Sequence, residues 1–505
     1  VHSTTKVTNM WGGNAGTTLT NTNGGGVLIQ ADGIEDSLKV QFNTTGKVAV
    51  EPYGGTSWVT TPNFDSDYSF VTSNPSLVRF GKDGATGTTN VGGGISIPAP
   101  TEVYGTDITT NGNLTVTTSG SKLLLKATNQ VTTSAGTAGT IQTNNGPITL
   151  WSDADKVSGT ASNGGNIFIN TSTTIKSQGG NITMAGGLDD GGTDSGLTTA
   201  AGYLTRTAGD GIPDGYAKGS NSGADSTGSD GVYLAGSHLI YSAGGNVFMA
   251  GWGSSRTSPA VQETGIQSFN GTVDSGTGLL YAVGKATGTA CGSHGIYTNA
   301  VSAGTVAPDV WTSANTTANA IRMLGDASTA TGTCNRGIVS WNYAANQGTT
   351  AWQGFRVLAT GTGGGVTLTG YGANYSGGSN GDGLDLNFTD VLAVSGPITL
   401  NGSTPTAVGD SSAGLAVGKY GNGANTLRLG GFPAYSYTNQ AGTVTNFATS
   451  TSPITINTDR MWVQYSIVGV VFNTTNEVKI LPLEQSFDQS TVNGFDFANF
   501  SFAST

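Results

Sequence analysis

Charged residues are scarce in this sequence, and their scarcity narrows the classes of protein to which it can belong. Lys, Arg, Asp and Glu make up 10% of the 505 residues, against a usual share of roughly 25%. The 20 Lys and Arg residues form no basic cluster, and the net charge is −11. Nucleic acids and anionic lipids attract basic surfaces, so we expect no nucleic-acid partner.

Cysteines and long apolar runs are also scarce. Two cysteines, Cys291 and Cys334, are too few for a disulfide-dense module or a Cys-based zinc cluster. The longest apolar run lies within residues 465–472. It is far shorter than the ~20 residues that a membrane-spanning helix needs, so we expect no transmembrane segment. The chain begins at Val1 without a charged-then-apolar leader, which indicates a processed chain or a part of a longer one.

Glycine is the residue in excess, and it argues against helices. The chain has 81 glycines, 16 Tyr, 17 Phe and 8 Trp, and it is 36% hydrophobic. Gly, Ser, Thr and Asn disfavour helix interiors through backbone entropy, restricted rotamers or competing hydrogen bonds. The aromatic and apolar content is too high for a disordered chain. The composition therefore predicts a folded β protein.

One short pattern recurs along the chain: a glycine followed, directly or after a Pro or Asn, by an apolar–any–apolar triplet. Its copies begin at Gly146, Gly165, Gly180, Gly245, Gly365 and Gly396. A sister pattern begins at Gly231, Gly265, Gly295, Gly337, Gly354 and Gly383. Each copy alternates as a strand does, and each opens at a turn residue. Short strands repeated in this way predict coils that stack and pair side by side.

These repeats predict an all-β fold, a right-handed parallel β-helix (solenoid) with loop excursions. A β-sandwich would need longer strands and hairpin turns, and a β-propeller would show signature dipeptides at a ~40–45-residue repeat. At roughly 25–30 residues per coil, residues 90–440 should form about 12–14 coils.

Three regions are expected. Residues 1–90 form an N-terminal β region that leads into the solenoid, and residues 91–440 hold the repeats. Within the repeats, residues 186–230 are rich in Gly, Ser and Asp and predict a long excursion from the coil stack. Residues 441–505 form a C-terminal cap or a small β module, because the last coil of a solenoid has unpaired ladder groups to cover.

Several stretches resemble a known family of repeats. Residues 143–155, with the Gly146 copy, and residues 38–52, 111–116 and 164–167 are similar to the haemagglutinin-like repeats of very large bacterial exoproteins. The resemblance extends over residues 25–430, and such proteins look like filamentous haemagglutinin. It implies a right-handed β-helix that is exported to the cell surface and acts as an adhesin stalk or matrix component.

An enzyme is the alternative from another class, because some β-helices process polysaccharides. A polygalacturonase-like site needs clustered aspartates, a Gly-His-Gly motif and a basic substrate-binding motif. Here Asp189 and Asp190 precede the string Gly292-Ser293-His294-Gly295 by about a hundred residues, and no basic motif follows. We therefore expect no catalytic residues, a non-enzymatic protein, and a turn position for His294.

Calcium is the cofactor that the sequence leaves open. Asp210-Gly211-Ile212-Pro213-Asp214-Gly215 resembles the Asp-rich turns of calcium-binding repeats. Hard cations prefer several carboxylate and carbonyl oxygens on a flexible turn. Asp210 and Asp214 are thus candidate ligands of a weak calcium site, and the alternative is a solvated polar loop. No other cofactor is expected.

Cys291 and Cys334 stand at similar places in neighbouring repeats, shortly before Gly295 and Gly337. If residues 295–337 form one enlarged coil, the two cysteines lie one rung apart, at about 5 Å, within reach of a disulfide. If residues 320–323 start a separate coil, they lie two rungs apart. The spacing favours one coil and a disulfide, and the alternative is two separate thiols.

The function that follows from these observations is mechanical and adhesive. We expect a non-enzymatic extracellular segment of a bacterial surface adhesin, with host or neighbouring-cell glycans or proteins as partners. The alternative is a self-assembling surface filament, matrix or surface-layer subunit whose partners are copies of itself. Three tryptophans either stack on glycans or shield the coils: Trp151, Trp252 and Trp352.

Overall fold

The structure, a computed structural model, contains strands and turns and no helix in its described part. Its fold is a parallel β-helix, as the sequence predicts. No helix there is long and apolar enough to cross a membrane. The structure describes residues 17–21, 24–31, 33, 39–53, 57–58, 61–71, 74–84, 87–134, 138–155, 165–193, 197, 207–220, 229–254, 263–289, 291–299, 308–341, 354–373, 381–405, 412–418, 426–432, 435–458, 460–463, 469–483 and 500–502.

The chain divides into two compact units, Val1–Thr160 with Gly164–Ala217, and Ala161–Asn163 with Lys218–Thr505. We call them unit 1 and unit 2. Each unit contains strands of three parallel sheets, which we call sheets 1, 2 and 3. The short strand β20 (Ala217–Lys218) stands where the two units meet in the sequence.

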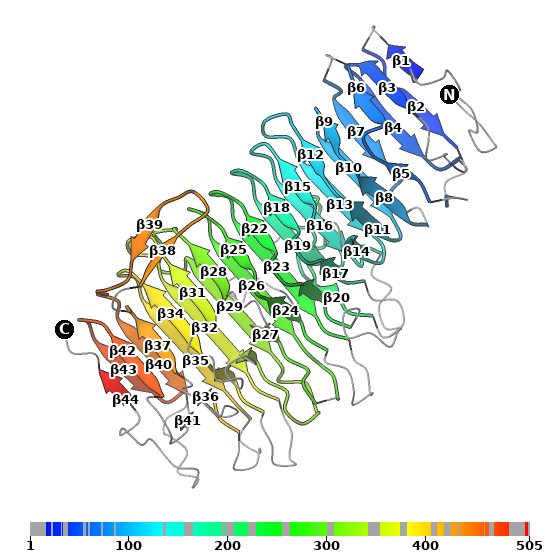
Figure 1. Cartoon of the computed structure of the whole chain (residues 1–505). Helices are drawn as coiled ribbons and strands as arrows, with labels where there is room; N and C mark the ends of the chain where they lie inside the picture. The colour runs from blue at the N-terminus through cyan, green and yellow to red at the C-terminus, as the bar shows by residue number, and fades with distance from the viewer. Residues whose placement is uncertain are drawn as a thin grey trace. The chain divides into compact units, whose positions relative to one another are not determined.

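In unit 1, the strands pair in parallel with the strand one coil away (Figure 1). Sheet 1 runs through β2 (Val27–Gln30), β4 (Lys47–Glu51), β7 (Leu77–Phe80), β10 (Thr101–Gly105), β13 (Leu123–Ala127), β16 (Ile148–Ser152) and β19 (Ile182–Gly186). Sheet 2 contains β5 (Asn63–Phe64), β8 (Thr89–Gly92), β11 (Ile108–Asn111), β14 (Val131–Thr133) and β17 (Ile167–Ile169). Sheet 3 contains β9 (Ile95–Ile97), β12 (Leu114–Val116), β15 (Thr140–Thr143) and β18 (Thr174–Lys176). A further parallel sheet holds β1 (Thr17–Asn21), β3 (Val40–Thr44) and β6 (Tyr68–Phe70).

Unit 2 repeats this arrangement with longer coils. Sheet 1 runs through β23 (Val247–Trp252), β26 (Leu280–Lys285), β29 (Ile321–Asp326), β32 (Val366–Tyr371), β35 (Ile398–Ser403), β40 (Ile454–Thr458) and β43 (Val478–Leu481). Sheet 2 contains β21 (Val232–Leu234), β24 (Ile266–Phe269), β27 (Ile296–Asn299), β30 (Ile338–Trp341), β33 (Leu384–Leu386), β36 (Leu415–Val417) and β41 (Met461–Val463). Sheet 3 contains β22 (Leu239–Tyr241), β25 (Thr272–Asp274), β28 (Asp309–Ser313), β31 (Phe355–Ala359), β34 (Thr389–Ala393), β37 (Leu427–Gly430), β42 (Val470–Asn473) and β44 (Phe500–Phe502).

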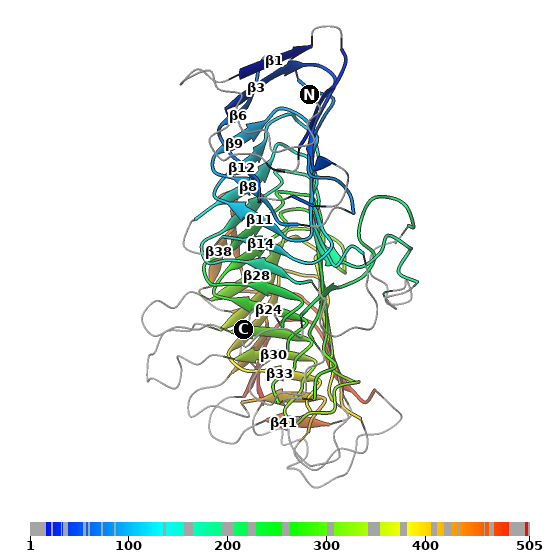
Figure 2. The ribbon, with the colours of Figure 1, turned by 90° about the vertical axis from the view of Figure 1, so that its right-hand side faces the viewer.

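Each coil of unit 2 takes one strand from each sheet. The chain passes from β21 to β22 and β23, and then enters the next coil at β24. In Figure 2, β24, β30 and β33 follow one another along sheet 2. The register is regular, since Ile266 pairs with Ile296, Ile296 with Ile338, and Ile338 with Leu384. The right-handed sense of the coils, which is usual for parallel crossovers, stays a prediction.

The glycine-led patterns mark strands of two of the sheets. The first pattern opens β16, β19, β23, β32 and β35 of sheet 1, and the sister pattern opens β21, β24, β27, β30 and β33 of sheet 2. The copies at Gly165 and Gly354 open β17 and β31. The apolar residues of the patterns point inward as predicted: Val366 and Leu368 of β32 are 0% exposed, whereas Thr367 between them is half-buried. Burial of this apolar surface is the main stabilising contribution to each coil.

The predicted number of coils was too high. Between residues 90 and 440, the described strands of sheet 1 are four in unit 1 and five in unit 2, each marking one coil. The coil from Leu123 to Ile148 has the expected length, whereas the coil from Thr101 to Leu123 is shorter than expected. Coils such as the one from Ile338 to Leu384 are longer because loops are inserted between their strands.

Glycine is required where the chain leaves sheet 1 and re-enters at sheet 2, a corner that we call the neck. A Cβ on Gly284 would stand 1.9 Å from the carbonyl oxygen of Gly295, and a Cβ on Gly325 2.0 Å from that of Gly337. Such contacts are closer than any side chain tolerates. The glycines near the ends of sheet 1 strands and the glycines that open sheet 2 strands therefore let the two backbones approach closely at the base of each inserted loop.

The strands near both ends of the chain continue the same ladders. In unit 1, β2 and β4 join sheet 1 ahead of residue 91, where the sequence placed the start of the repeats. In unit 2, β40, β41 and β42 pair in parallel with β35, β36 and β37, so the described part of residues 441–505 adds to the coils. The expected excursion at residues 186–230 returns to the coil at an antiparallel bridge between Gly186 and Gly215.

A hairpin in unit 2 departs from the parallel pattern. Strands β38 (Ser436–Thr438) and β39 (Val444–Asn446) are antiparallel and belong to a segment, residues 431–452, that we call the strap. The strap lies on the outer side of sheet 3, where Phe447 packs with Val310, Leu358 and Leu392. Its far end reaches β25, because the backbone N–H of Gln440 donates to Asp274 at 3.1 Å.

Candidate functional site

A column of buried polar residues lies at the neck of unit 2. These residues directly precede the sheet 2 glycines, and each is at most 4% exposed: Asp230, Thr264, His294, Arg336 and Asp382. Three of these side chains, those of Asp230, His294 and Asp382, accept a backbone N–H from the following coil. The bonds run from Thr264 N–H to Asp230 Oδ1 (2.7 Å), from Arg336 N–H to His294 Nδ1 (3.3 Å) and from Ala413 N–H to Asp382 Oδ1 (2.8 Å). The column thus joins successive coils through side chains as well as through the backbone ladder.

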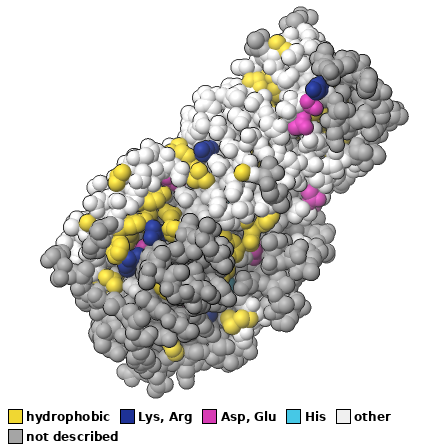
Figure 3. Space-filling view, viewed as in Figure 1, with side chains coloured by type: hydrophobic (Ala, Val, Ile, Leu, Met, Phe, Trp, Pro, Cys, Tyr) yellow, Lys and Arg dark blue, Asp and Glu magenta, His cyan; other side chains and the backbone are white. Residues whose placement is uncertain are grey.

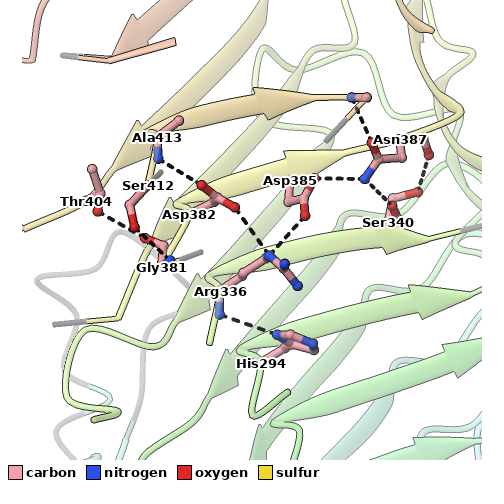
Figure 4. A network of polar contacts seen from close by, with 11 residues as sticks. His294, Arg336, Ser340, Gly381, Asp382, Asp385, Asn387, Thr404, Ser412 and Ala413 are labelled. Atoms are coloured by element: carbon pink, nitrogen blue, oxygen red, sulfur yellow. Dashed lines mark hydrogen bonds and ion pairs between the residues drawn. The ribbon is translucent and has the colours of Figure 1, made fainter. Parts of the chain in front are cut away.

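Arg336 is the basic residue of this column and lies between two carboxylates (Figure 4). Its Nε is 2.9 Å from Asp385 Oδ2 and 3.3 Å from Asp382 Oδ2, and neither carboxylate is more than 1% exposed. Asp385 also accepts a hydrogen bond from Asn387 Nδ2 at 2.7 Å. Buried charges persist only when they are paired and hydrogen-bonded in this way. The cluster therefore locks two coils together.

His294 was expected in a turn; it lies after the turn at Cys291 and Gly292, just before the bend at Gly295 that leads into β27, and it is buried. Its ring is 1% exposed, and burial together with the nearby Arg336 charge lowers its pKa well below the usual range. The imidazole is therefore neutral. Because Nδ1 accepts the Arg336 N–H, the ring carries its proton on Nε2. This geometry gives His294 a structural role in joining coils.

A second buried polar cluster lies in unit 2 between sheets 2 and 3. Asp309 accepts the Gly271 N–H at 3.3 Å, and His238 binds the Ala235 carbonyl oxygen through Nδ1 at 2.8 Å. Burial raises the pKa of Asp309 to about 7, although the Ser268, Gly271 and Trp311 groups around it favour the carboxylate. Burial lowers the pKa of His238 to about 4. Both side chains are thus held toward their neutral forms.

The proposed calcium ligands are occupied by backbone groups of unit 1. Asp214 is 2% exposed and accepts the Gly191 N–H at 2.7 Å, while Asp210 accepts the Ile212 N–H at 2.9 Å. Asp189 accepts the N–H groups of residues 209–211. Within the described ranges, no three His, Cys, Asp or Glu side chains form a group that could hold a metal ion. These carboxylates therefore order a polar loop, and calcium at Asp210 and Asp214 stays a prediction.

The cysteines lie in the arrangement that the coil spacing predicts, as free thiols. Ile296 pairs with Ile338, and β29 belongs to the same turn, so residues 295–337 form one enlarged coil. Cys291 is exposed and Cys334 is half-buried. Partial burial and the neighbouring Cys334 thiol raise the pKa of Cys291 to about 11. The two thiols are therefore neighbours, and a disulfide between them stays a prediction.

The tryptophans that were candidates for glycan stacking contact lysines instead. In unit 1, Lys126 Nζ lies 4.5 Å from the centre of the Trp151 ring, and Trp151 Nε1 donates to Gly187. In unit 2, Lys285 Nζ lies 4.2 Å from the centre of the Trp252 ring. Trp151 is only 4% exposed, so it shields the coil. Trp352 lies outside the described residues.

A charged cluster holds the strap on sheet 3. Arg428 binds Asp390 through two nitrogens, at 2.5 and 2.7 Å, and Arg356 Nε lies 3.4 Å from the same carboxylate. On the strap side, the Arg356 guanidinium lies 4.7 Å from the Tyr435 ring, and that of Arg428 lies 3.7 Å from the Phe432 ring. The aromatic rings cover the two guanidinium groups, so the cluster joins three coils to the strap.

No family model, curated protein or solved structure matches this chain. The chemistry of the site must therefore be judged from its geometry. The buried ionic and polar groups described above bond to neighbouring coils, to their own loops or to the strap. The sequence identified His294 and both cysteines. It missed Arg336 and Asp382, whose only signal was their place just before a glycine that opens a strand, and it missed Asp309, the first residue of β28.

Proposed function

We propose that this chain is a non-enzymatic structural segment of an extracellular bacterial surface adhesin, a stiff element that holds a binding partner away from the cell. The observation that carries the proposal is the cross-coil bonding of unit 2. Arg336 joins two coils through Asp382 and Asp385. In sheet 3, Asp390 joins three coils through Arg356 and Arg428, and the strap reaches Asp274 through the N–H of Gln440. Such bonds resist the separation of coils, which is the direction in which a tethered adhesin is pulled.

The outer surface fits this use. Among the described residues on the face shown in Figure 3, few side chains are charged. Outward positions of sheet 1 carry Thr367, Thr369 and Asn401, and Asn401 Nδ2 donates to Thr369 at 3.1 Å. A polar surface of low charge suits weak, repeated contacts with glycans or proteins of a host or neighbouring cell.

Single-molecule pulling on the full chain tests the proposal. Force applied across unit 2 should meet a resistance that falls when Arg336 is replaced by Met, because the bonds to Asp382 and Asp385 are lost. The matched control is Lys479→Met, which removes an exposed ion pair with Glu477 and should change nothing measurable. Equal rupture forces for the wild type and Arg336→Met would contradict a mechanical role for this bond.

Two further measurements separate the alternatives. Electron microscopy of the purified chain should show discrete particles, whereas continuous filaments would identify a self-assembling subunit. A panel of polysaccharides should yield no cleavage products. Turnover that disappears in His294→Ala or Asp190→Ala would identify an enzyme and overturn the proposal.

A further inference from the structure

Cys291 and Cys334 stand at equivalent turns of two successive coils of unit 2. Cys291 and Gly292 form a turn ahead of β27, and residues 333–334 form a turn ahead of β30. Because Ile296 pairs with Ile338, the same register places Gly292 opposite Cys334. The two cysteine Cα atoms are therefore about one rung and one residue apart, which is ~6 Å in a parallel ladder. A disulfide accepts this separation.

Hydrogen bonds hold the two turns side by side. Asn335, the residue after Cys334, donates from Nδ2 to the Gly288 carbonyl oxygen at 3.2 Å and accepts the Ser293 N–H on Oδ1 at 2.9 Å. Along the chain, these two bonds lie on either side of Cys291. The Cys334 thiol is within hydrogen-bonding reach of the Cys291 thiol. The two sulfur atoms therefore need little movement of the backbone to form a bond.

The segment between the two cysteines is one complete coil. It contains β27 of sheet 2, β28 of sheet 3 and β29 of sheet 1. A bond between the cysteines therefore closes about 43 residues, with all three strands of that coil, into a covalent ring. In sheet 2, β24 and β30 pair with this coil on its two sides. A coil held by hydrogen bonds alone can unwind under tension, whereas a covalent ring cannot be pulled straight.

We propose that oxidation of Cys291 and Cys334 by a small-molecule disulfide turns this coil into a covalent ring that limits how far unit 2 extends under load. The mechanical consequence rests on the proposed function, because a surface adhesin is pulled and stands in an oxidising exterior. The bond itself depends only on the geometry of the two turns. Its formation can therefore be tested apart from any adhesive role.

Cys291 meets the oxidant first, because its side chain is exposed and that of Cys334 is half-buried. The Cys291 thiolate attacks one sulfur of the oxidant and expels one small thiolate. The Cys334 thiolate then attacks the Cys291 sulfur of the mixed disulfide and expels the second. Two protein thiols thus become one disulfide, the oxidant is reduced to two thiols, and the two protons pass to the released thiolates. Because burial and the Cys334 thiol raise the pKa of Cys291 to about 11, alkaline pH speeds the first step.

Thiol titration of the denatured full chain tests the bond. The reduced protein should show its two thiols, and after incubation with oxidised glutathione at mildly alkaline pH it should show none. Peptide mapping without reductant should join the peptides that contain Cys291 and Cys334 and should find no glutathione on either. Cys291→Ser, the matched control, should form no bond within the chain. Two remaining thiols, two glutathione adducts or a bond between two chains would overturn the proposal.

Single-molecule pulling on the full chain measures the ring. The oxidised chain should extend about 14 nm less than the reduced chain, because about 43 residues no longer contribute at roughly 3.4 Å each. Reductant should restore the length, and Cys291→Ser should have one length under both conditions. An oxidised chain that extends as far as the reduced one overturns the ring. If the length shortens but Arg336→Met leaves the rupture force unchanged, the ring stands and the mechanical function proposed above fails.

Discussion

Buried ionisable side chains make individual residues of unit 2 sensitive to pH. Asp309 and His238 are both held toward their neutral forms by burial, but they act in opposite directions. The folded state retains a proton on Asp309 that the unfolded state loses. His238 gains a proton on unfolding once the pH falls below its ordinary pKa of 6.5. His238 therefore contributes stability that is lost as pH falls from 6.5 toward 4.

Replacing Asp309 with Asn removes the pH-dependent contribution of Asp309 to stability and leaves that of His238. The folded pKa of about 7 lies above the ordinary 3.8, so the contribution of Asp309 is fully present below 3.8 and is lost as pH rises through 7. The wild type should therefore lose about 2–3 kcal/mol relative to Asp309→Asn between pH 5 and pH 7. Urea unfolding of both proteins at the two pH values measures this difference. A constant difference would mean that Asp309 stays ionised in the fold.

These buried residues show what the sequence could not supply. Asp309 is the first residue of β28, a strand that no glycine introduces, and nothing in the neighbouring sequence separates it from other aspartates of a polar chain. Its burial depends on packing against Gly271, which lies one coil away. The position of His294 beside a neck glycine was visible in the sequence. Its contact with Arg336 was not, because that contact depends on the coil register.

Among the elements, the strap is the one that the repeat pattern did not predict. Residues 441–505 were expected to form a C-terminal cap or a small β module. The hairpin β38–β39 lies along the side of sheet 3, and β40 onward returns to the ladders. Outward Val310, Leu358 and Leu392 are the cause, since an apolar outer face needs a cover. In unit 1 the outward residues of β15, Thr140 and Gln142, are polar.

Two positions on the same strap test what it contributes. Phe447 is 0% exposed and packs on sheet 3, whereas Val444 is 63% exposed. Phe447→Ala should destabilise unit 2 by about 3–5 kcal/mol, because it leaves a cavity between strap and sheet. Val444→Ala should stay within about 0.5 kcal/mol of the wild type. Chemical denaturation followed by tyrosine and tryptophan fluorescence compares them. Similar small effects would show that the strap is not tightly packed on the sheet.

Glycine placement also explains the error in the number of coils. The sequence showed the strands of sheets 1 and 2, because a neck glycine or a turn glycine opens them. It showed few strands of sheet 3, which begin with residues such as Leu239, Thr272 and Asp309. Inserted loops such as residues 286–295 then add length that carries no periodic signal. The fold class was therefore predictable, whereas the number and length of the coils were not.

At the scale of the whole molecule, the free energy of unfolding should depend mainly on contacts between adjacent coils. Each strand pairs with its equivalents one coil away, as Ile338 does with Ile296 and Leu384. In such a stack, stability is approximately a sum of coil terms and neighbour terms. Two features add contacts that cross coils: the strap, and the column of buried polar residues that contains Arg336. The number of coils that these contacts join decides how far from a mutation the destabilisation extends.

A cavity in the middle of unit 2 tests how far such a defect extends. Ile338 is 0% exposed, and Ile338→Ala should remove about 2–5 kcal/mol of packing from one coil. Native-state hydrogen exchange should then show the largest loss of protection in β27, β30 and β33, which contain or pair with this position. Strands β23 and β40 lie further along the stack and should keep wild-type protection, because each coil packs mainly on its neighbours. Exposed Val444→Ala serves as the control and should change no strand. An equal loss of protection in β23, β30 and β40 would show instead that unit 2 opens as one cooperative body.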